Sequence, residues 1–492
     1  MAHVIVASDD QLTYVPGDCG CLEYRRPPDQ LGQFLINDCG LWPTLKPPPD
    51  GTDLRRLRAH PLLRTLALDQ HYAVAFVPSY SRVAVIDAWA AALLKRLPTD
   101  GSTPTTEERE TVAQLAAAGL LSEQADSRVP PPAPPTTLVA WLHLTTACNL
   151  RCSYCYSAPR NEVMSAATAC QAVDAVVRTA VRHGYRSILL KYAGGEPLLQ
   201  LPLLLATQHY AQTTAAAQNL QVAGAVLSNG VLLDQRAATQ LAQAGLSVMV
   251  SLDGMAGVHD ALRPTVNGNP SYQAAMRGLK QARAAGVPVT VGITVTAGNV
   301  NHLPEFVTTL LAEDLPFGIS FYRDHAPARL ADGLRPDEQQ LIEGMRRVYA
   351  AVAARPPRWS VLSALLDRAH PGAAHQRSCA SGEHYLVIDP HGRIARCQMT
   401  IMETLTSVDA QDPLDDLRRD PSGAHSLPVD AKAGCRSCEW RYWCGGGCAV
   451  TIHRATGCTE ARSPSCAIYQ ALFPDILRME GQRLLHWHQH TA

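Results

Sequence analysis

The sequence has little net charge, no basic run and no long apolar segment. Its 492 residues carry a formal net charge of -1, and the isoelectric point is about 7.0. Neither nucleic acid nor an anionic membrane surface is therefore expected as the main partner. The uncharged stretch between Glu196 and Asp234 is rich in Gln, Thr, His and Asn, so it does not predict a membrane span. The N-terminus lacks the charged-then-apolar pattern of a signal peptide, which predicts a cytoplasmic protein.

The chain also lacks the character of a small secreted domain held together by disulfides. Its 15 cysteines belong to a long chain without an export signal, and most of them fall into groups with ligand-like spacing. This clustering predicts metal sites rather than disulfides. Cys170 stands alone and is expected in the core, and Cys19, Cys21 and Cys39 are expected to be ordinary reduced thiols.

The length predicts more than one domain, because a chain of this size rarely folds around a single core. The run from Val129 to Pro135 contains five prolines in seven residues and predicts a stiff spacer. The domains expected are an N-terminal domain (1–129), a Pro-rich linker (130–136), an α/β domain (137–325), a helical connection (326–375) and a cysteine-rich domain (376–492).

The N-terminal region predicts a small α+β unit. Residues His71 to Phe76 and Arg82 to Ile86 are typical of a β-hairpin, and Ala88 to Arg96 of a helix. A second helix is expected to start near the cap at Thr105 and to carry Val112, Leu115 and Leu120.

Strand and helix patterns alternate over the next two hundred residues. Strands are expected at 138–144, 187–193, 221–228, 247–252, 288–296 and 316–321, with helices at 164–183, 199–217, 234–244, 271–285 and 301–314. Alternation of this kind implies a parallel sheet with right-handed crossovers. Six units are fewer than a closed barrel of eight strands needs, so the barrel should be open on one side.

Three cysteines follow the first of these strands, in the segment Cys148-Asn-Leu-Arg-Cys152-Ser-Tyr-Cys155. Thiolates suit iron–sulfur clusters or zinc, and three of them on one loop can hold three corners of a four-iron cube while one iron stays open to a ligand. The alternative is a cysteine-lined core helix, since positions i, i+4 and i+7 share one helical face. The position after a barrel strand favours the cluster, because α/β barrels place their chemistry there.

This triplet resembles the cluster motif of the radical S-adenosylmethionine (SAM) enzymes, and the resemblance extends to later strand ends. Gly194-Gly195-Glu196-Pro197 is similar to the family's glycine-rich segment, whose backbone receives the SAM amino group. Further segments similar to those lining the SAM pocket contain Ser228 and Asn229, then Ser251 and Asp253. Arg263 occupies the position where similar enzymes pair an arginine with the SAM carboxylate. The resemblance implies a partial (βα)6 barrel and reductive cleavage of SAM to a 5′-deoxyadenosyl radical.

A second array of cysteines resembles the SPASM extension of peptide-modifying radical SAM enzymes. The resemblance implies an outer auxiliary cluster on Cys435, Cys438, Cys444 and Cys466, and an inner one on Cys379, Cys397 and Cys448. The fourth ligand of the inner cluster stays open between Cys458, His375, the substrate and none. Structural zinc is the alternative, because C-x2-C pairs are also zinc spacing. The implied cofactors are SAM and three iron–sulfur clusters, one that binds SAM and two auxiliary, each expected to be of the 4Fe–4S type.

The N-terminal unit is similar to the peptide-recognition element of enzymes that modify ribosomally made peptides, which bind a leader peptide at a sheet edge. The alternative is a small lid that only packs on the barrel. The combination implies an oxidoreductase that takes hydrogen from a precursor peptide to install a thioether, C–C or C–O crosslink. A reducing donor such as flavodoxin or ferredoxin would supply the electron.

Two other functions stay open. The first is a sulfatase-maturing enzyme that generates formylglycine, although such enzymes place an aspartate where this chain has Gln398. The second is a non-catalytic iron–sulfur protein that binds or transfers electrons, which the Gly194–Pro197 segment disfavours. The sequence identifies no catalytic base for the substrate.

Overall fold

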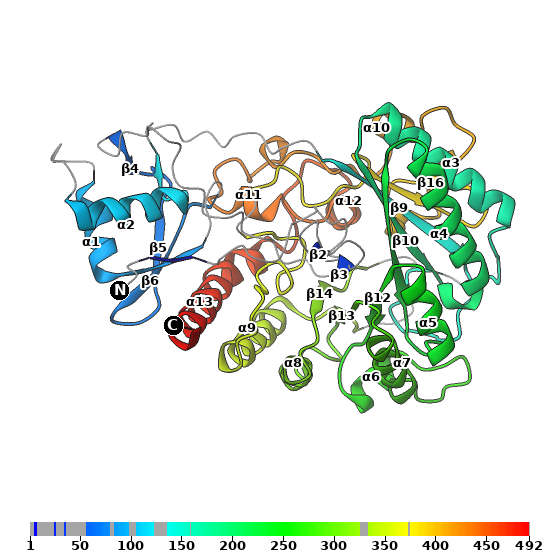
Figure 1. Ribbon diagram of the computed structural model, residues 1–492, viewed down its shortest axis with the longest axis horizontal. Coiled ribbons are helices and arrows are strands. Elements are labelled where there is room, and N and C mark those ends of the chain that lie inside the picture. Colours follow the sequence, from blue (N-terminus) through cyan, green and yellow to red (C-terminus); the bar gives the residue numbers. More distant parts are fainter. Residues whose placement is uncertain are drawn as a thin grey trace.

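A computed structural model describes residues 4–6, 24–25, 34–35, 56–78, 83–97, 105–122, 135–157, 159–324, 333–371 and 374–491. Cys19, Cys21, Cys39 and most of the Pro-rich linker lie outside this range. The small N-terminal unit and the parallel barrel lie at opposite ends of the molecule, and most of the C-terminal part lies between them (Figure 1).

Six parallel strands in sequence order form the barrel wall, as the alternating pattern predicts. They are β9 (Thr137–Thr145), β10 (Ser187–Gly194), β11 (Gln221–Ser228), β12 (Leu246–Ser251), β13 (Val289–Val295) and β14 (Phe317–Phe321). All nine residues of β9 are buried, which is why its sequence is a nearly continuous apolar run. Because the strands are parallel, their C-terminal ends meet at one rim.

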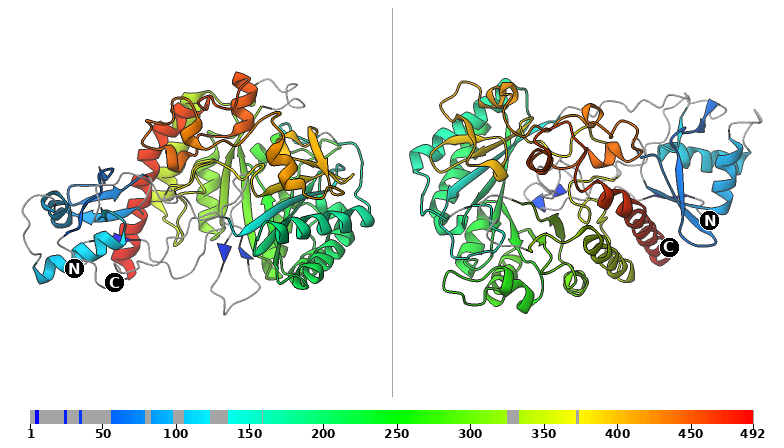
Figure 2. Two further views of the ribbon diagram at one scale, coloured as in Figure 1. Left: turned by 90° about the horizontal axis from the view of Figure 1, so that it is seen from above. Right: turned by 180° about the vertical axis from the view of Figure 1, so that it is seen from behind.

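Helices cover the outer face of this sheet (Figures 1 and 2). They are α3 (Ala166–Arg182), α4 (Leu201–Ala216) after a 3₁₀ turn at Pro197–Gln200, α5 (Gln235–Gln243), α7 (Tyr272–Ala284) and α8 (Leu303–Ala312). The amphipathic pattern of the sequence predicts each of these helices. It misses α6 (Ala256–Leu262), because seven residues are too few to show a helical period clearly.

The sheet continues past β9 into the C-terminal part of the chain. Strand β15 (Tyr385–Ile388) lies parallel to β9, with Tyr385 opposite Val139, and β16 (Arg393–Ala395) and β17 (Thr404–Ser407) follow antiparallel. The sequence does not predict this addition, since four buried residues without a following helix give little local signal. Barrel and cysteine-rich region therefore share one nine-stranded sheet.

The N-terminal unit is a four-stranded antiparallel sheet with two helices, in the strand order β1-β7-β6-β5. Its elements are β1 (Val4–Val6), β5 (Arg64–Ala67), β6 (Tyr72–Phe76), β7 (Ala84–Asp87), α1 (Ala88–Arg96) and α2 (Thr106–Ala117). Thr105 caps α2 in a capping box with Glu108, as predicted. Leu120 was expected on this helix, but α2 ends at Ala117 and Leu120 is buried in the turn beyond it. Short pairs also form between β2 (Tyr24–Arg25) and β3 (Phe34–Leu35), and between β4 (Arg58–Ala59) and β8 (Leu121–Ser122).

The two faces of this small sheet pack against two different hydrophobic cores. Ala75, Ala84 and Ile86 join the core beneath α1 and α2. Val74, Phe76, Val83 and Val85 belong instead to the main core of the protein. The helix that covers this second face is α13 (Cys466–Thr491), the last helix described.

Of the remaining helices, the first connects the barrel to the cysteine-rich region and the other three lie within that region. They are α9 (Glu338–Ala354), which packs on α8 and α13, then α10 (Pro413–Arg419), α11 (Arg441–Cys444) and α12 (Ala449–Thr456). Among the described residues, no helix combines the length and apolar character needed to cross a bilayer.

Candidate active site

The cysteine triplet lies on the loop that leaves the C-terminal end of β9, as predicted. The segment after α6 holds this loop in place: Arg151 donates its backbone N–H to Pro264 O at 2.7 Å, and Ser153 donates to Leu262 O at 3.0 Å. Leu150 also forms an isolated antiparallel bridge with Thr265. The cysteines are thus outside any helix, so the cysteine-lined core helix is excluded.

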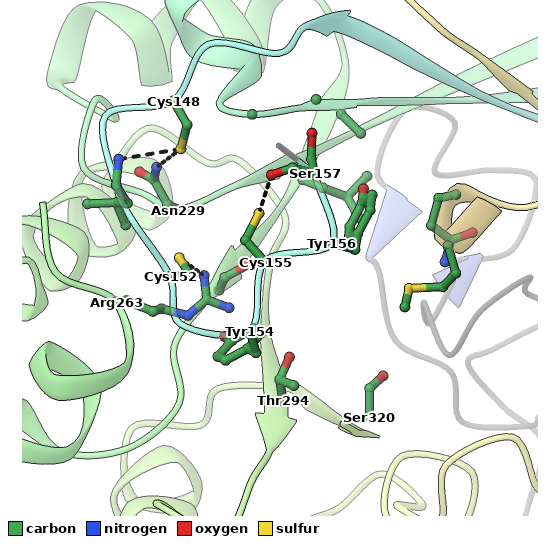
Figure 3. A pocket seen from close by; sticks show the side chains of 18 of the residues that line it. Cys148, Cys152, Tyr154, Cys155, Tyr156, Ser157, Asn229, Arg263, Thr294 and Ser320 are labelled. Carbon is green, nitrogen blue, oxygen red and sulfur yellow. Dashed lines mark hydrogen bonds between the residues drawn. The ribbon is translucent and has the colours of Figure 1, made fainter. Parts of the chain in front are cut away.

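The three thiols lie around one part of a shared cavity, and each has a polar neighbour (Figure 3). The Asn229 side-chain amide donates to Cys148 Sγ at 3.9 Å, Arg263 Nη1 donates to Cys152 Sγ at 3.7 Å, and Cys155 Sγ donates to Ser157 O at 3.3 Å. Burial raises the pKa of Cys152 to about 12, against the opposing effect of Arg263. The thiols must therefore lose their protons when they bind a cluster. The positive charge of Arg263 stabilises the thiolate that Cys152 then forms.

Gly194 and Gly195 pack directly against the start of the cysteine loop. A Cβ on Gly194 would lie 2.2 Å from Thr145 O, and one on Gly195 would lie 2.1 Å from Ala147 O. Gly194 has a φ of +142°, which only glycine adopts readily. Gly195 N–H donates to Thr145 O at 2.8 Å. These glycines therefore form part of the cavity wall while fixing the position of the cysteine loop.

Glu196 and Pro197 were expected to bind SAM, but neither lines the cavity that the three thiols surround. Glu196 is fully buried and accepts hydrogen bonds from Ser228 Oγ at 2.8 Å and from Asn229 N at 2.8 Å. Its pKa is raised to about 7 by burial, which outweighs these bonds. Pro197 is the first residue of the buried 3₁₀ turn. Glu196 thus ties the glycine segment to the end of β11.

Arg263 is held by a buried carboxylate. Asp253 Oδ2 accepts from Arg263 Nε at 2.5 Å and from the Tyr154 hydroxyl, and Asp253 Oδ1 accepts from Thr294 N at 2.8 Å. The Arg263 guanidinium also stacks over the Tyr154 ring at 5.1 Å. Asp253 is fully buried and does not line the cavity. It positions the arginine that was expected to contact SAM.

A cavity of about 510 Å³ joins these residues to the C-terminal part of the chain. Of the residues expected to bind cofactor, Gly194, Gly195, Ser228, Asn229, Ser251 and Arg263 line it. The opposite wall is formed by Arg323, Arg368, Gln398 and Met399. The sequence did not single out either of these arginines as a site residue. Tyr154 was also missed, although its place inside the cysteine motif was a usable signal.

Four of the C-terminal cysteines lie near one another. Cys444 interacts electrostatically with Cys466, Cys435 and Cys438, so these four thiols form one neighbourhood. Burial raises the pKa of Cys444 to about 12. Gly445, Gly446 and Gly447 all have φ between +59° and +81°, which lets the chain turn tightly beside Cys444. Four thiols and a glycine turn fit the needs of a cluster held by cysteines alone.

The residue next to one cysteine of the inner group lines the cavity. Gln398 directly follows Cys397 and lines the cavity wall, and it accepts a hydrogen bond from Tyr385 at 2.7 Å. Burial alone would raise the pKa of Cys448, but the cations of Arg323 and Arg368 outweigh it and the pKa is lowered. Arg323 and Arg368 therefore link the cavity wall to a thiol of the inner group.

The two residues considered as a fourth inner ligand differ in setting. Cys458 is exposed and its thiol contacts Thr456. His375 packs its ring against His370, with ring centres 5.0 Å apart. Among the described residues, no group of three or more His, Cys, Asp or Glu side chains is placed so that it could hold a single metal ion.

Comparison with known proteins agrees with this geometry. Residues 142–309 match the model of the radical SAM superfamily. An uncharacterized protein of Methanocaldococcus jannaschii is 31% identical over 172 residues, which are 35% of this chain and 57% of that protein. The PqqA peptide cyclase of Gluconobacter oxydans is 27% identical over 360 residues, covering 68% of this chain and 92% of the cyclase.

Among solved structures, anSMEcpe with bound AdoMet and the Cp18Cys peptide is similar at 16% identity and a TM-score of 0.57. The match covers 73% of this chain and all of that one, so the fold is shared beyond the barrel. The cysteine loop and the glycine wall both lie within residues 142–309, the part of this chain that matches the radical SAM superfamily.

Proposed function

We propose that this protein is a radical SAM peptide maturase, which abstracts hydrogen from a ribosomally synthesised peptide to install a crosslink. One observation carries the proposal: a single cavity has the cysteine loop on one wall and residues adjoining the inner cysteine group on the other. A substrate in this cavity would lie between the two metal-binding regions. The similarity to a peptide cyclase and to a fold that holds a peptide agrees with such a substrate.

In this proposal Cys148, Cys152 and Cys155 hold the SAM-binding 4Fe–4S cluster. When bound, the cluster and SAM supply the one-electron reduction that yields a carbon radical. Arg263, oriented by Asp253, pairs with the SAM carboxylate, and the backbone of Gly194 and Gly195 receives its amino group. The cavity walls orient the target C–H bond and exclude water.

The seven C-terminal cysteines would hold two auxiliary clusters that accept the electron remaining on the product. Residues adjoining the inner group line the cavity, so the inner cluster would lie nearer the substrate. A flavodoxin or ferredoxin would supply electrons, and we place the protein in the cytoplasm. The small N-terminal sheet would bind the leader part of the peptide along β5, which is an edge strand of this sheet in the described part of the chain.

The test combines SAM cleavage with product formation. The protein is reduced anaerobically with SAM and a peptide encoded in a neighbouring reading frame, and 5′-deoxyadenosine and peptide mass are measured. We expect a peptide that has lost two hydrogens per crosslink. Cys148→Ala should abolish SAM cleavage, whereas Cys435→Ala should retain cleavage and lose the crosslinked product. Absence of 5′-deoxyadenosine above background in the wild type would leave only an iron–sulfur binding protein.

Formylglycine formation is the second candidate, because sulfatase-maturing enzymes share the cysteine pattern that this chain resembles. Gln398 lines the cavity where a carboxylate base would be expected, and an amide cannot accept a proton usefully. A hydrazide probe separates the two functions, since it labels the aldehyde of formylglycine and leaves a crosslinked peptide unlabelled.

A further inference from the structure

Lys432 is a buried lysine in the middle of the C-terminal cysteines. Its side chain is 1% exposed, and Nζ donates to Gly446 O at 3.2 Å and to Gly447 O at 3.5 Å. A Cβ on Gly446 would lie 2.6 Å from Lys432 Cδ and 2.9 Å from Nζ. The glycine turn therefore closes over the lysine, and the ammonium cannot move to solvent without opening that turn.

The carbonyls that accept from Lys432 Nζ belong to Gly446 and Gly447, which lie in the sequence between Cys444 and Cys448. Burial lowers the pKa of Lys432, and negative charge on the thiols of Cys379, Cys435, Cys444 and Cys448 acts in the opposite direction. Two of these, Cys435 and Cys444, belong to the proposed outer cluster. The other two, Cys379 and Cys448, belong to the proposed inner cluster. The lysine is thus shared between both groups rather than assigned to one.

Three arginines also lie near these cysteines. Arg323 and Arg368 act on Cys448 of the inner group. Arg462 is exposed and acts on Cys466, Cys435 and Cys438 of the outer group. Arg462 therefore offers a matched comparison, because its charge is close to one group only and is screened by water.

A buried cation changes the reduction potential of a nearby cluster. Reduction adds one negative charge, and an adjacent positive charge favours that state most strongly where the dielectric constant is low. Charge and hydrogen bonding around the sulfurs are established determinants of cluster potentials. A charge between two clusters acts on both in the same direction.

We propose that Lys432 is a shared counter-charge that raises the reduction potentials of both auxiliary clusters together. The inference rests on the proposed function, because it requires that the cysteines hold two clusters. If Lys432 acts in this way, the two auxiliary clusters have similar reduction potentials, and either of them can accept an electron from the substrate.

The test is a redox titration of the anaerobically reconstituted protein, followed by electron paramagnetic resonance. K432Q keeps a hydrogen-bond donor for the carbonyls of Gly446 and Gly447 but removes the charge. We expect both auxiliary couples to move to more negative potential, with about a tenfold lower ratio of reduced to oxidised cluster at the wild-type midpoint. For a one-electron couple this corresponds to about 59 mV. K432R should keep both potentials close to wild type.

Two internal references accompany this measurement. The couple of the cluster on Cys148, Cys152 and Cys155 should stay unchanged in K432Q, and R462Q should shift the outer couple by less than K432Q does. Unchanged auxiliary potentials with full iron content in K432Q would overturn the inference. A shift confined to one auxiliary couple, or shared by all three clusters, would overturn it as well.

Iron analysis decides the case in which a variant does not assemble. Loss of auxiliary iron in K432Q and K432M but not in K432R supports a role for the charge. Loss of auxiliary iron in K432R as well shows that only the shape of lysine matters, and this result overturns the inference. A wild-type protein without two auxiliary couples would instead contradict the proposed function. The two failures are therefore distinguishable.

Discussion

At the scale of single residues, the absence of a side chain at Gly194 and Gly195 determines where the cysteine loop lies. Both positions contact the backbone of the segment Thr145–Ala147 more closely than a Cβ allows. A substitution must therefore move the loop that carries the three cysteines. The amide and carbonyl groups at this contact cannot move independently, because Gly195 N–H is bonded to Thr145 O.

Gly195→Ala tests this contact. We expect a loss of stability of about 1–3 kcal/mol from overpacking, and loss of the iron bound by the first cluster while the auxiliary iron remains. Iron analysis and the unfolding free energy measure the two effects. Gly257→Ala is the matched control, since a Cβ there meets nothing within 4 Å, and it should leave the iron content unchanged. Full iron binding in Gly195→Ala would show that the loop tolerates displacement.

Glu196 makes stability depend on pH. Burial raises its pKa to about 7 from an ordinary value of 4.5, so the folded protein binds this proton more tightly than the unfolded chain does. The contribution of Glu196 to the unfolding free energy should therefore fall as pH rises from about 4.5 to about 7, by up to about 3 kcal/mol. Glu196→Gln removes the titrating group, so this slope should disappear. Equal slopes in urea unfolding of wild type and variant would refute the assignment.

At the scale of elements, α13, the last helix described, packs on the sheet of the N-terminal unit. Gly481 of α13 meets the sheet of the N-terminal unit, where a Cβ would lie 2.5 Å from Val74 Cγ2 and 2.9 Å from Leu68 Cδ1. Further along α13, Arg483 forms a buried ion pair with Glu480 and donates to Arg358 O at 2.9 Å. The helix is therefore fixed to both the small sheet and the segment that follows α9.

Gly481→Ala should destabilise the protein by about 1–3 kcal/mol, although alanine favours a helix by about 1 kcal/mol. The physical reason is the missing space against Val74. Val74→Ala creates that space, so the double variant should be more stable than the sum of the single effects predicts, by about 0.5 kcal/mol or more. Equilibrium unfolding of the four proteins measures this coupling. Additive effects would mean that the helix shifts away from the sheet without cost.

At the scale of the whole molecule, an aromatic cluster attaches the N-terminal unit to the cysteine-rich region. The Phe76 ring lies 5.7 Å from the Trp440 ring and 5.5 Å from the Trp443 ring, and Phe473 stacks on Trp440 at 4.9 Å. Trp443 directly precedes Cys444. The N-terminal unit thus packs on the residues that position the outer group of cysteines.

This packing predicts that two separately expressed chains, 1–122 and 135–492, associate. Phe76→Ala should weaken the association at least a hundredfold, because burial of a phenylalanine contributes about 3–5 kcal/mol. Titration of one labelled chain with the other measures the dissociation constant. Arg64→Ala is the control: its ion pair with Glu439 is about half exposed on both sides and should contribute less than about 1 kcal/mol. Chains that do not associate would show that attachment depends on the connecting residues.

The sequence by itself determined the order of strands and helices in the barrel and the position of the cysteine triplet after its first strand. These features depend on local periodicity and on spacing along the chain, so they can be read without coordinates. The capping box at Thr105 belongs to the same class, because its partners are three residues apart. Two predictions failed: Leu120 was placed on α2, which ends at Ala117, and α6 was not predicted. Both concern stretches too short for a helical period to be recognised.

Only the tertiary structure decided which distant residues meet. It pairs β15 with β9, brings Arg323 and Arg368 to Cys448, and puts Lys432 among cysteines of both groups. It also separates Glu196 and Asp253 from the cavity that they support. The physical reason is that these contacts join segments far apart in sequence, and their free energy comes from burial and charge in the folded core, which leaves no periodic signal along the chain.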